Sequence, residues 1–199
     1  MPRYTGVNHL ALVTGNMDAT IRFWRDLLGM PIVAGLGKPG YRQYFLHIAN
    51  HSMLTFFEWD GVEPMDEKDH GYPTTGKVGF DHVSIGVESD DDLWELKDML
   101  DAAGFWVSEL VDHGFIHSLY SFDPNGIAIE FSCYVQHVDI ILHPRLTAAK
   151  PSAVTLEGPY KQAGKWPVVT APTQEHEKKL YPGEGHDFLT TSSNAWKNK

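Results

Sequence analysis

The chain has 199 residues, 42% of them hydrophobic, and a formal net charge of −10 with its histidines neutral. This size and composition are those of a globular protein with one core or two small fused modules. The acidic balance and the lack of a Lys/Arg-rich run argue against nucleic acid or an anionic membrane surface as a partner, and favour a small molecule.

No stretch of the sequence has the apolar core of a signal peptide, or the roughly 18 consecutive apolar residues of a membrane span. We therefore expect a cytoplasmic protein. Cys133 is the single cysteine, which excludes an internal disulfide and a thiolate-cluster metal site. A bound metal is accordingly expected to use His and carboxylate ligands.

Residues 5–59 predict a βαβββ module. Residues 6–13 indicate a strand, and residues 17–28 place apolar side chains at helical spacing between Asn16, a candidate N-cap, and Gly29, a C-terminal stop. Three further strands are expected where β-branched or aromatic runs are separated by turn residues, at residues 31–34, 41–49 and 52–59.

The same order returns in residues 79–134, which predicts a second βαβββ module. The strand-like run around His82 repeats the spacing of the run around His9, 73 residues earlier. Ser89 and Asp92 resemble a capping box that opens a helix. The last strands are expected at residues 106–111, 116–122 and 127–134. The sequence therefore predicts an α+β fold in which two βαβββ modules form one curved mixed sheet around a metal cavity.

Two segments lie outside the modules. Residues 60–78 are polar and rich in acids and turn residues, so we expect a linker or an inserted loop. Residues 135–199 are a C-terminal extension, partly irregular, in which residues 135–142 are the one candidate for an extra strand or short helix.

The repeat predicts a metal site. If equivalent strands of the two modules face one cavity, His9 and His82 become neighbours, and Glu130 joins them from the last strand of the second module. The position in the first module that matches Glu130 is Thr55, and threonine is a poor ligand. Two imidazoles and one carboxylate leave open coordination positions and suit Fe(II) that binds a substrate and O2, and Mn(II) accepts the same ligands.

A hairpin signal precedes this carboxylate. His113 is followed after five residues by Leu119 and Tyr120, and residues 123–126 read Asp-Pro-Asn-Gly, a turn whose proline presets φ and whose Asn-Gly tolerates positive φ. With Glu130 following the turn after three intervening residues, the pattern resembles the extradiol ring-cleavage dioxygenases of the vicinal oxygen chelate (glyoxalase/bleomycin resistance/dioxygenase) superfamily. The resemblance covers about residues 5–134.

The resemblance implies a role for each residue that matches the family motif. The predicted trio of two histidines and a glutamate corresponds to the iron ligands of the family. His113 and Tyr120 correspond to residues that hydrogen-bond the bound substrate, and His51 corresponds to the catalytic acid/base histidine. Because residues 60–78 look inserted relative to the family, His70 is the alternative for this last role.

The expected function is that of an Fe(II)-dependent extradiol dioxygenase, which cleaves the ring of a catecholic aromatic compound with both atoms of O2, as in aromatic hydrocarbon catabolism. The expected partners are a small aromatic diol, O2 and further copies of the chain in a homo-oligomer. Two alternatives stay open. One is another metal-dependent enzyme of the superfamily, a lyase, isomerase or glyoxalase-like enzyme, and the other is a metal-free small-molecule binding protein of the resistance type. The presence of His51, His113 and Tyr120 favours the dioxygenase.

Overall fold

The structure is a computed structural model that describes residue 3 and residues 5–76 and 79–189. The chain divides into two units, Met1–Val138 and Asp139–Lys199. The first unit contains both predicted modules, and each unit is described here by itself.

The first module has the predicted order of elements. Its four strands form a sheet in the order β1-β4-β3-β2, with β1 parallel to β4 and the other pairs antiparallel. The Asn16 side chain accepts a hydrogen bond from the backbone N–H of Ala19, which confirms the predicted N-cap. The helix is α-helical for its first part and then continues as a π-helical segment. The elements are β1 His9–Thr14, α1 Met17–Ile21, the π-helical segment Arg22–Leu27, β2 Ile32–Lys38, β3 Tyr41–Ala49 and β4 Ser52–Trp59.

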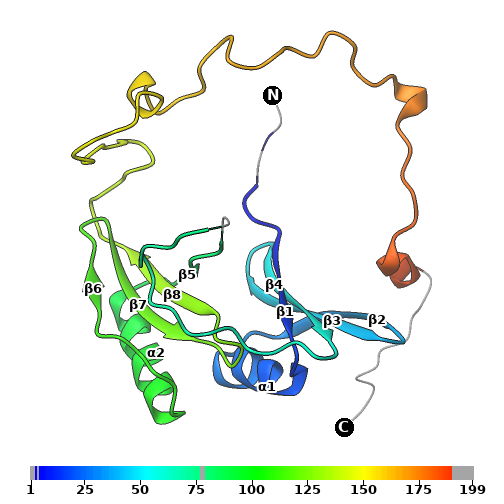
Figure 1. Ribbon diagram of the computed structural model, residues 1–199, viewed down its shortest axis with the longest axis vertical. Coiled ribbons are helices and arrows are strands. Elements are labelled where there is room, and N and C mark those ends of the chain that lie inside the picture. Colours follow the sequence, from blue (N-terminus) through cyan, green and yellow to red (C-terminus); the bar gives the residue numbers. More distant parts are fainter. Residues whose placement is uncertain (1–2, 4, 77–78, 190–199) are drawn as a thin grey trace. The chain divides into compact units, whose positions relative to one another are not determined.

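The second module repeats this arrangement (Figure 1), with the sheet order β5-β8-β7-β6. Ser89 and Asp92 form the predicted capping box at the start of α2. The strand expected at residues 106–111 is reduced to the short β6 and an isolated bridge between Val107 and Ser121. The elements are β5 Val83–Gly86, α2 Asp90–Ala102, β6 Val111–Asp112, β7 Ile116–Phe122 and β8 Ala128–Tyr134. The predicted α+β fold of two βαβββ modules is confirmed, and its strands hydrogen-bond into two four-stranded mixed sheets, one in each module.

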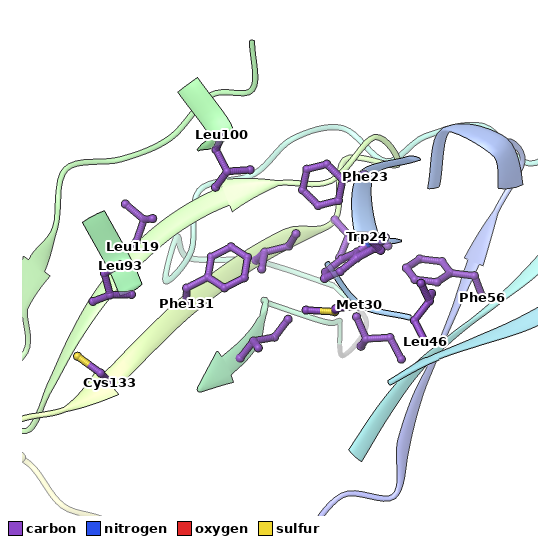
Figure 2. Packing of buried hydrophobic residues seen from close by; sticks show 14 of the residues in the cluster. Phe23, Trp24, Met30, Leu46, Phe56, Leu93, Leu100, Leu119, Phe131 and Cys133 are labelled. Carbon is purple, nitrogen blue, oxygen red and sulfur yellow. The ribbon is translucent and has the colours of Figure 1, made fainter. Parts of the chain in front are cut away.

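One hydrophobic core serves both modules (Figure 2). Trp24 and Phe56 enter it from the first module, and Leu93 and Phe131 enter it from the second; each is at most 1% exposed. Phe23 beside α1 meets Phe105, which follows α2, edge to face with ring centroids 4.7 Å apart. The modules therefore share buried apolar surface, the main stabilising term in folding.

The Asp-Pro-Asn-Gly turn also joins the modules. Asp123 accepts a hydrogen bond from the indole N–H of Trp24 at 3.1 Å, although the two residues belong to different modules. Asn125 accepts from the hydroxyl of Thr14 at 2.6 Å and donates to Thr20 at 3.1 Å. Because Asp123 and Asn125 are 2% and 6% exposed, these bonds are sheltered from water. The turn is thus a buried connection as well as the start of β8.

Residues 60–76 form an inserted loop without helix or strand. The predicted candidate segment at residues 135–142 contains turns but neither a strand nor a helix. The described part of the second unit, up to residue 189, has only three 3-10 helical segments, at Thr155–Glu157, Glu175–Glu177 and Glu184–Leu189. Among the described residues, no helix combines the length and apolar character needed to cross a membrane.

Candidate functional site

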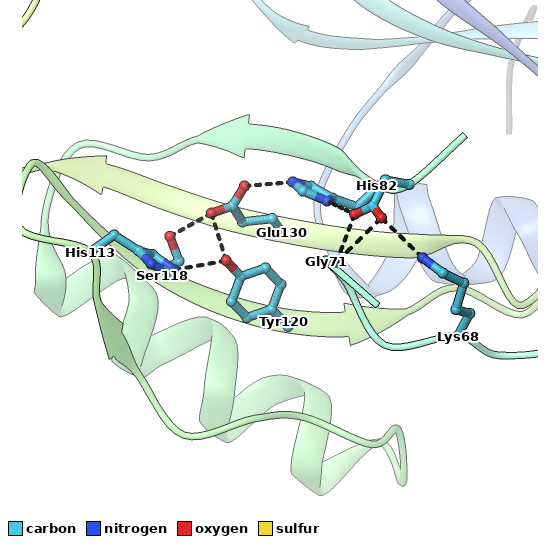
Figure 3. Close-up of polar contacts among 8 residues, drawn as sticks. Lys68, Gly71, His82, His113, Ser118, Tyr120 and Glu130 are labelled. Atoms are coloured by element: carbon cyan, nitrogen blue, oxygen red, sulfur yellow. Dashed lines mark hydrogen bonds and ion pairs between the residues drawn. The ribbon is translucent and has the colours of Figure 1, made fainter. Parts of the chain in front are cut away.

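Glu130 is the buried centre of a polar cluster on the second-module sheet (Figure 3). It lies on β8, directly opposite Tyr120 of β7, and is 4% exposed. One carboxylate oxygen, Oε1, accepts hydrogen bonds from the hydroxyls of Ser118 at 2.5 Å and Tyr120 at 3.1 Å. Burial raises the pKa of Glu130, but the hydroxyl donors, chiefly Ser118 and Ser84, outweigh it and hold the pKa below its ordinary value. The side chain is therefore a carboxylate at neutral pH.

His82 meets the other oxygen of this carboxylate. It directly precedes β5, and its Nε2 lies 3.1 Å from Oε2 of Glu130. Its Nδ1 lies 2.6 Å from the Asp81 carboxylate, which also accepts from the Lys68 ammonium and the Gly71 backbone N–H. The hydrogen bond with His82, helped by Lys68, lowers the pKa of Asp81 far below its ordinary range. A carboxylate on one ring nitrogen fixes the imidazole so that the other nitrogen is presented to Glu130, an arrangement common in histidines that bind metals.

Tyr120 and His113 extend the cluster on the other side. The hydroxyl of Tyr120 lies 2.9 Å from Nε2 of His113. Because the ionised Glu130 can only accept, the single hydroxyl proton of Tyr120 points to Glu130, and His113 donates its Nε2–H to the phenol oxygen. Burial, and then the charge of Glu130, raise the pKa of Tyr120 to about 12. Tyr120 is therefore a proton-bearing donor at every physiological pH.

The inserted loop folds back over this cluster. The ring of His70 stacks on the ring of Tyr120, with centroids 3.4 Å apart and an interplanar angle of 1°. It also meets the ring of His82 edge to face at 6.2 Å. The loop is held there by bonds from Lys68 and Gly71 to Asp81. His70 is thus in contact with the cluster that contains the predicted site residues.

His9 does not join the cluster in this structure. It is exposed at the start of β1, where its Nδ1 lies 2.9 Å from the Asn8 side chain and its ring packs edge to face on Phe45 at 5.7 Å. In the described part of the chain, the donor atoms of His9, His82 and Glu130 do not form a group that lies within 4.8 Å. The structure brings two members of the predicted ligand trio together, and the complete trio stays a prediction.

The corresponding positions of the first module have no carboxylate. Thr55 is fully buried on β4 at the position that corresponds to Glu130, and its hydroxyl accepts a hydrogen bond from Gln43 at 3.0 Å. Gln43 in turn corresponds to Ser118 by the same 75-residue offset. Glu58, further along β4, is used elsewhere, because it accepts from the Met17 backbone N–H at the start of α1. Neither Thr55 nor Glu58 supplies the site with another free carboxylate.

His51 lies at the tip of the two-residue turn between β3 and β4, where it is exposed. The preceding residue, Asn50, has a φ of 50°, which suits such a tight turn. A cavity of about 530 Å³ separates this hairpin from the start of β5. It has the volume and the mainly apolar lining of a small-molecule site, with His82 at its wall and Val7, Ile48, Met53, Phe80 and Val83 around it.

Sequence reasoning did not identify Ser118 and Asp81 as site residues. The signal was present in part, because Ser118 shares a strand face with Tyr120. Asp81 immediately precedes His82, so adjacency alone could not show that its carboxylate bends back to the same imidazole.

Comparison with known proteins finds relatives over the region of the two modules. The Glyoxalase/Bleomycin resistance protein/Dioxygenase superfamily profile matches residues 6–131. The chain is 29% identical over 154 residues to an iron-dependent extradiol dioxygenase from Rhodococcus jostii, a match that covers 67% of this chain and 45% of that protein. It is 27% identical over 128 residues to a lactoylglutathione lyase from Haemophilus influenzae, which covers 62% of this chain and 88% of that protein.

A solved structure shows the same fold. The crystal structure of a glyoxylase/bleomycin resistance protein/dioxygenase domain from Frankia sp. EAN1pec superposes with a TM-score of 0.57 at 24% identity, covering 67% of this chain and 100% of that one. The match to the dioxygenase, by contrast, spans less than half of that protein's length.

Proposed function

The chain belongs to the Glyoxalase/Bleomycin resistance protein/Dioxygenase superfamily, and from this premise we propose that it is an Fe(II)-dependent extradiol dioxygenase that opens the ring of a catecholic compound with O2. The observation that carries the proposal is the set of contacts around the Glu130 carboxylate. One of its oxygens faces His82 and the other faces the Tyr120–His113 pair. A proposed metal ligand and a proton-bearing tyrosine thus meet at one buried carboxylate.

The proposed metal ligands are His9, His82 and Glu130, with Fe(II) as the metal and Mn(II) as the alternative. The donor types fit, and the geometry fits for the two ligands of the second module, since Nε2 of His82 and Oε2 of Glu130 already face each other. His9 has to turn from Asn8 towards them. The chemistry that Fe(II) supplies in such a site is electron transfer between a bound aromatic diol and O2.

The protein groups control protons and orientation. Glu130 stays ionised because Ser118 and Tyr120 hydrogen-bond its charged form. His113 holds the oxygen of Tyr120, and the raised pKa of Tyr120 keeps its proton in place, so the hydroxyl can turn from Glu130 and donate to an ionised diol oxygen. We propose this donation as the role of Tyr120, with His113 orienting it.

Two histidines compete for the acid/base role. His51, at the tip of the β3–β4 turn, is the candidate that the sequence motif indicates. His70 is supported by position, because it stacks on Tyr120 beside His82. An imidazole has an ordinary pKa of about 6.5 and can give and accept a proton near neutrality. We propose His70 as the acid/base and expect His70→Ala to lower kcat at least tenfold, whereas His51→Ala should lower it less than threefold.

A second candidate function is a lyase or isomerase that uses the same metal ligands. Coverage favours the lyase: the match spans 88% of the lactoylglutathione lyase, whereas the match to the dioxygenase spans 45% of that protein. The lyase has no evident use for the Tyr120–His113 pair or for the ring of His70. These residues make the dioxygenase our first choice.

The test is oxygen uptake by the protein after anaerobic loading with Fe(II), with a panel of catechols added in air. Stoichiometric uptake with a coloured ring-opened product is expected. The variant Glu130→Gln should lose metal and turnover together, and Glu109→Gln, at an 84% exposed side chain outside the site, is the matched control. No uptake by a protein that retains one metal ion, together with formation of lactoylglutathione in a parallel assay that supplies glutathione and methylglyoxal, would refute the dioxygenase and support the lyase.

A further inference from the structure

A second group of metal-binding side chains lies on the opposite face of the second-module sheet. Side chains alternate along a strand, so His117 and Cys133, each three residues from Tyr120 or Glu130, face away from the candidate site. His117 of β7 and Cys133 of β8 are direct partners across the two strands. Figure 2 shows Cys133 at one end of the core, on the side covered by Leu93 of α2.

The third member is Asp90, the first residue of α2. One oxygen, Oδ1, lies 2.7 Å from Nδ1 of His117 and 3.1 Å from Sγ of Cys133. All three donor atoms lie within 4.8 Å of one another, and no other group of three or more such residues in the described part of the chain meets this distance. Cys133 is 4% exposed, whereas the Asp90 side chain is 52% exposed, so the cluster is buried on one side and reaches solvent on the other.

We propose that Asp90, His117 and Cys133 bind a zinc ion. Thiolate, imidazole and carboxylate are the protein ligands that Zn²⁺ uses, and it takes four ligands in a tetrahedron. The solvent-exposed side of the cluster leaves room for a water as the fourth. Tetrahedral zinc places its ligand atoms about 3.4 to 3.6 Å apart, so the two close pairs must open by about 0.5 to 0.7 Å, which a rotation of the exposed Asp90 side chain supplies.

Asp112 supports this assignment. Its Oδ1 lies 3.6 Å from Nε2 of His117, within ion-pair range but beyond a direct hydrogen bond, and accepts from the backbone N–H of Gly114 at 2.6 Å. A carboxylate beside one ring nitrogen of a ligating histidine orients the ring and leaves the other nitrogen for the metal. Here Nδ1 is the nitrogen that faces Asp90, so it is the nitrogen that we propose binds the zinc.

The proposed zinc site differs from the proposed iron site in chemistry and in place. It contains the chain's single thiol, on the face of the sheet opposite Glu130. Zinc has no redox chemistry, and a zinc ion here would link the N-terminal end of α2 to strands β7 and β8. Because a metal that binds the folded state preferentially adds to its stability, we assign this zinc a structural role.

Cobalt(II) tests the site directly, because it replaces zinc and gives an intense near-ultraviolet absorption band when a thiolate binds it. Metal-free protein is titrated with Co(II) under argon. A thiolate–cobalt band that saturates at one equivalent and is displaced by Zn²⁺ is expected for the wild type. Since Cys133 is the single cysteine, this band can arise from no other site in the chain.

Four variants separate the sites. Cys133→Ser should abolish the band, and Asp90→Asn should weaken cobalt binding at least tenfold. Asp91→Asn is the matched control, because it removes a neighbouring exposed charge from the same helix end and should leave binding unchanged. Glu130→Gln should keep the band while losing Fe(II)-dependent turnover.

A folded wild-type protein without a thiolate–cobalt band would overturn the zinc site and leave the proposed dioxygenase untouched. A normal band with no oxygen uptake would overturn the proposed dioxygenase and leave the zinc site untouched. Zinc should also raise the melting temperature of the wild type but not of Asp90→Asn. An equal rise in both would overturn the structural role.

Discussion

Trp24 is expected to hold the two modules together through its hydrogen bond to Asp123. Trp24 is fully buried, and its indole N–H donates to Oδ2 of Asp123 at 3.1 Å. A hydrogen bond to a charged group contributes about 1.5 to 3 kcal/mol, and the space left by the smaller ring of phenylalanine costs about 1 kcal/mol more. We therefore expect Trp24→Phe to lower the free energy of unfolding by about 3 kcal/mol.

Urea unfolding followed by circular dichroism measures this change. With a slope of about 2 kcal/mol/M, the midpoint should fall by about 1.5 M at an unchanged slope. Trp94→Phe on α2 is the matched control, because Trp94 is 48% exposed and its replacement should change the free energy of unfolding by less than about 0.5 kcal/mol. Equal midpoints for Trp24→Phe and Trp94→Phe would refute the buried connection.

Three further predictions concern the same hairpin. A Cβ at Gly126, where φ is +73°, would lie 2.1 Å from the Met65 carbonyl oxygen. Gly126→Ala should therefore lower the free energy of unfolding, measured in urea, by more than about 2 kcal/mol. The control is Gly114→Ala, which has a φ of +82° and no atom within 4 Å of the added Cβ, and which should lower it by only about 1 kcal/mol. Burial raises the pKa of Asp123 above its ordinary 3.8, so the folded protein holds this proton more tightly than the unfolded chain does. As the pH rises from 3.8 through the pKa of the folded state, the free energy of unfolding of the wild type should therefore fall relative to that of Asp123→Asn. Ultraviolet titration should show a tyrosine ionisation step near pH 12, and Tyr120→Phe, which removes the group with a pKa of about 12, should abolish that step.

The elements of the repeat could be predicted because their signals are local. Asn16 and Ser89 cap the predicted helices, and apolar spacing locates most strands to within a few residues. The N-terminal ends of the first strands were predicted too early, since β1 begins at His9 and β5 after His82. Propensity alone does not show where a strand loses its partner.

The contacts of the inserted loop could not be predicted from the sequence. Residues 60–76 have no periodic pattern, and their place depends on bonds such as that from the Met65 N–H to the carbonyl of Asn125 at 2.7 Å. These contacts join residues that are far apart in the chain and depend on the packed shape of both modules. The sequence indicated His70 as a candidate for the acid/base role, but it did not indicate that His70 stacks on Tyr120.

The turn before β8 links stability to the candidate site. Asn125 is bonded to the first module and to the inserted loop, and Glu130 follows five residues later on the strand that the turn begins. The loop that carries His70 is fixed at one end by this turn and at the other by Asp81, the partner of His82. A weakened turn should therefore loosen His70 before it disturbs the Glu130–His82 pair, since that pair is also held by Ser118 and Asp81 within the second module. Variants of the turn are accordingly expected to lose turnover at temperatures where they still retain their metal.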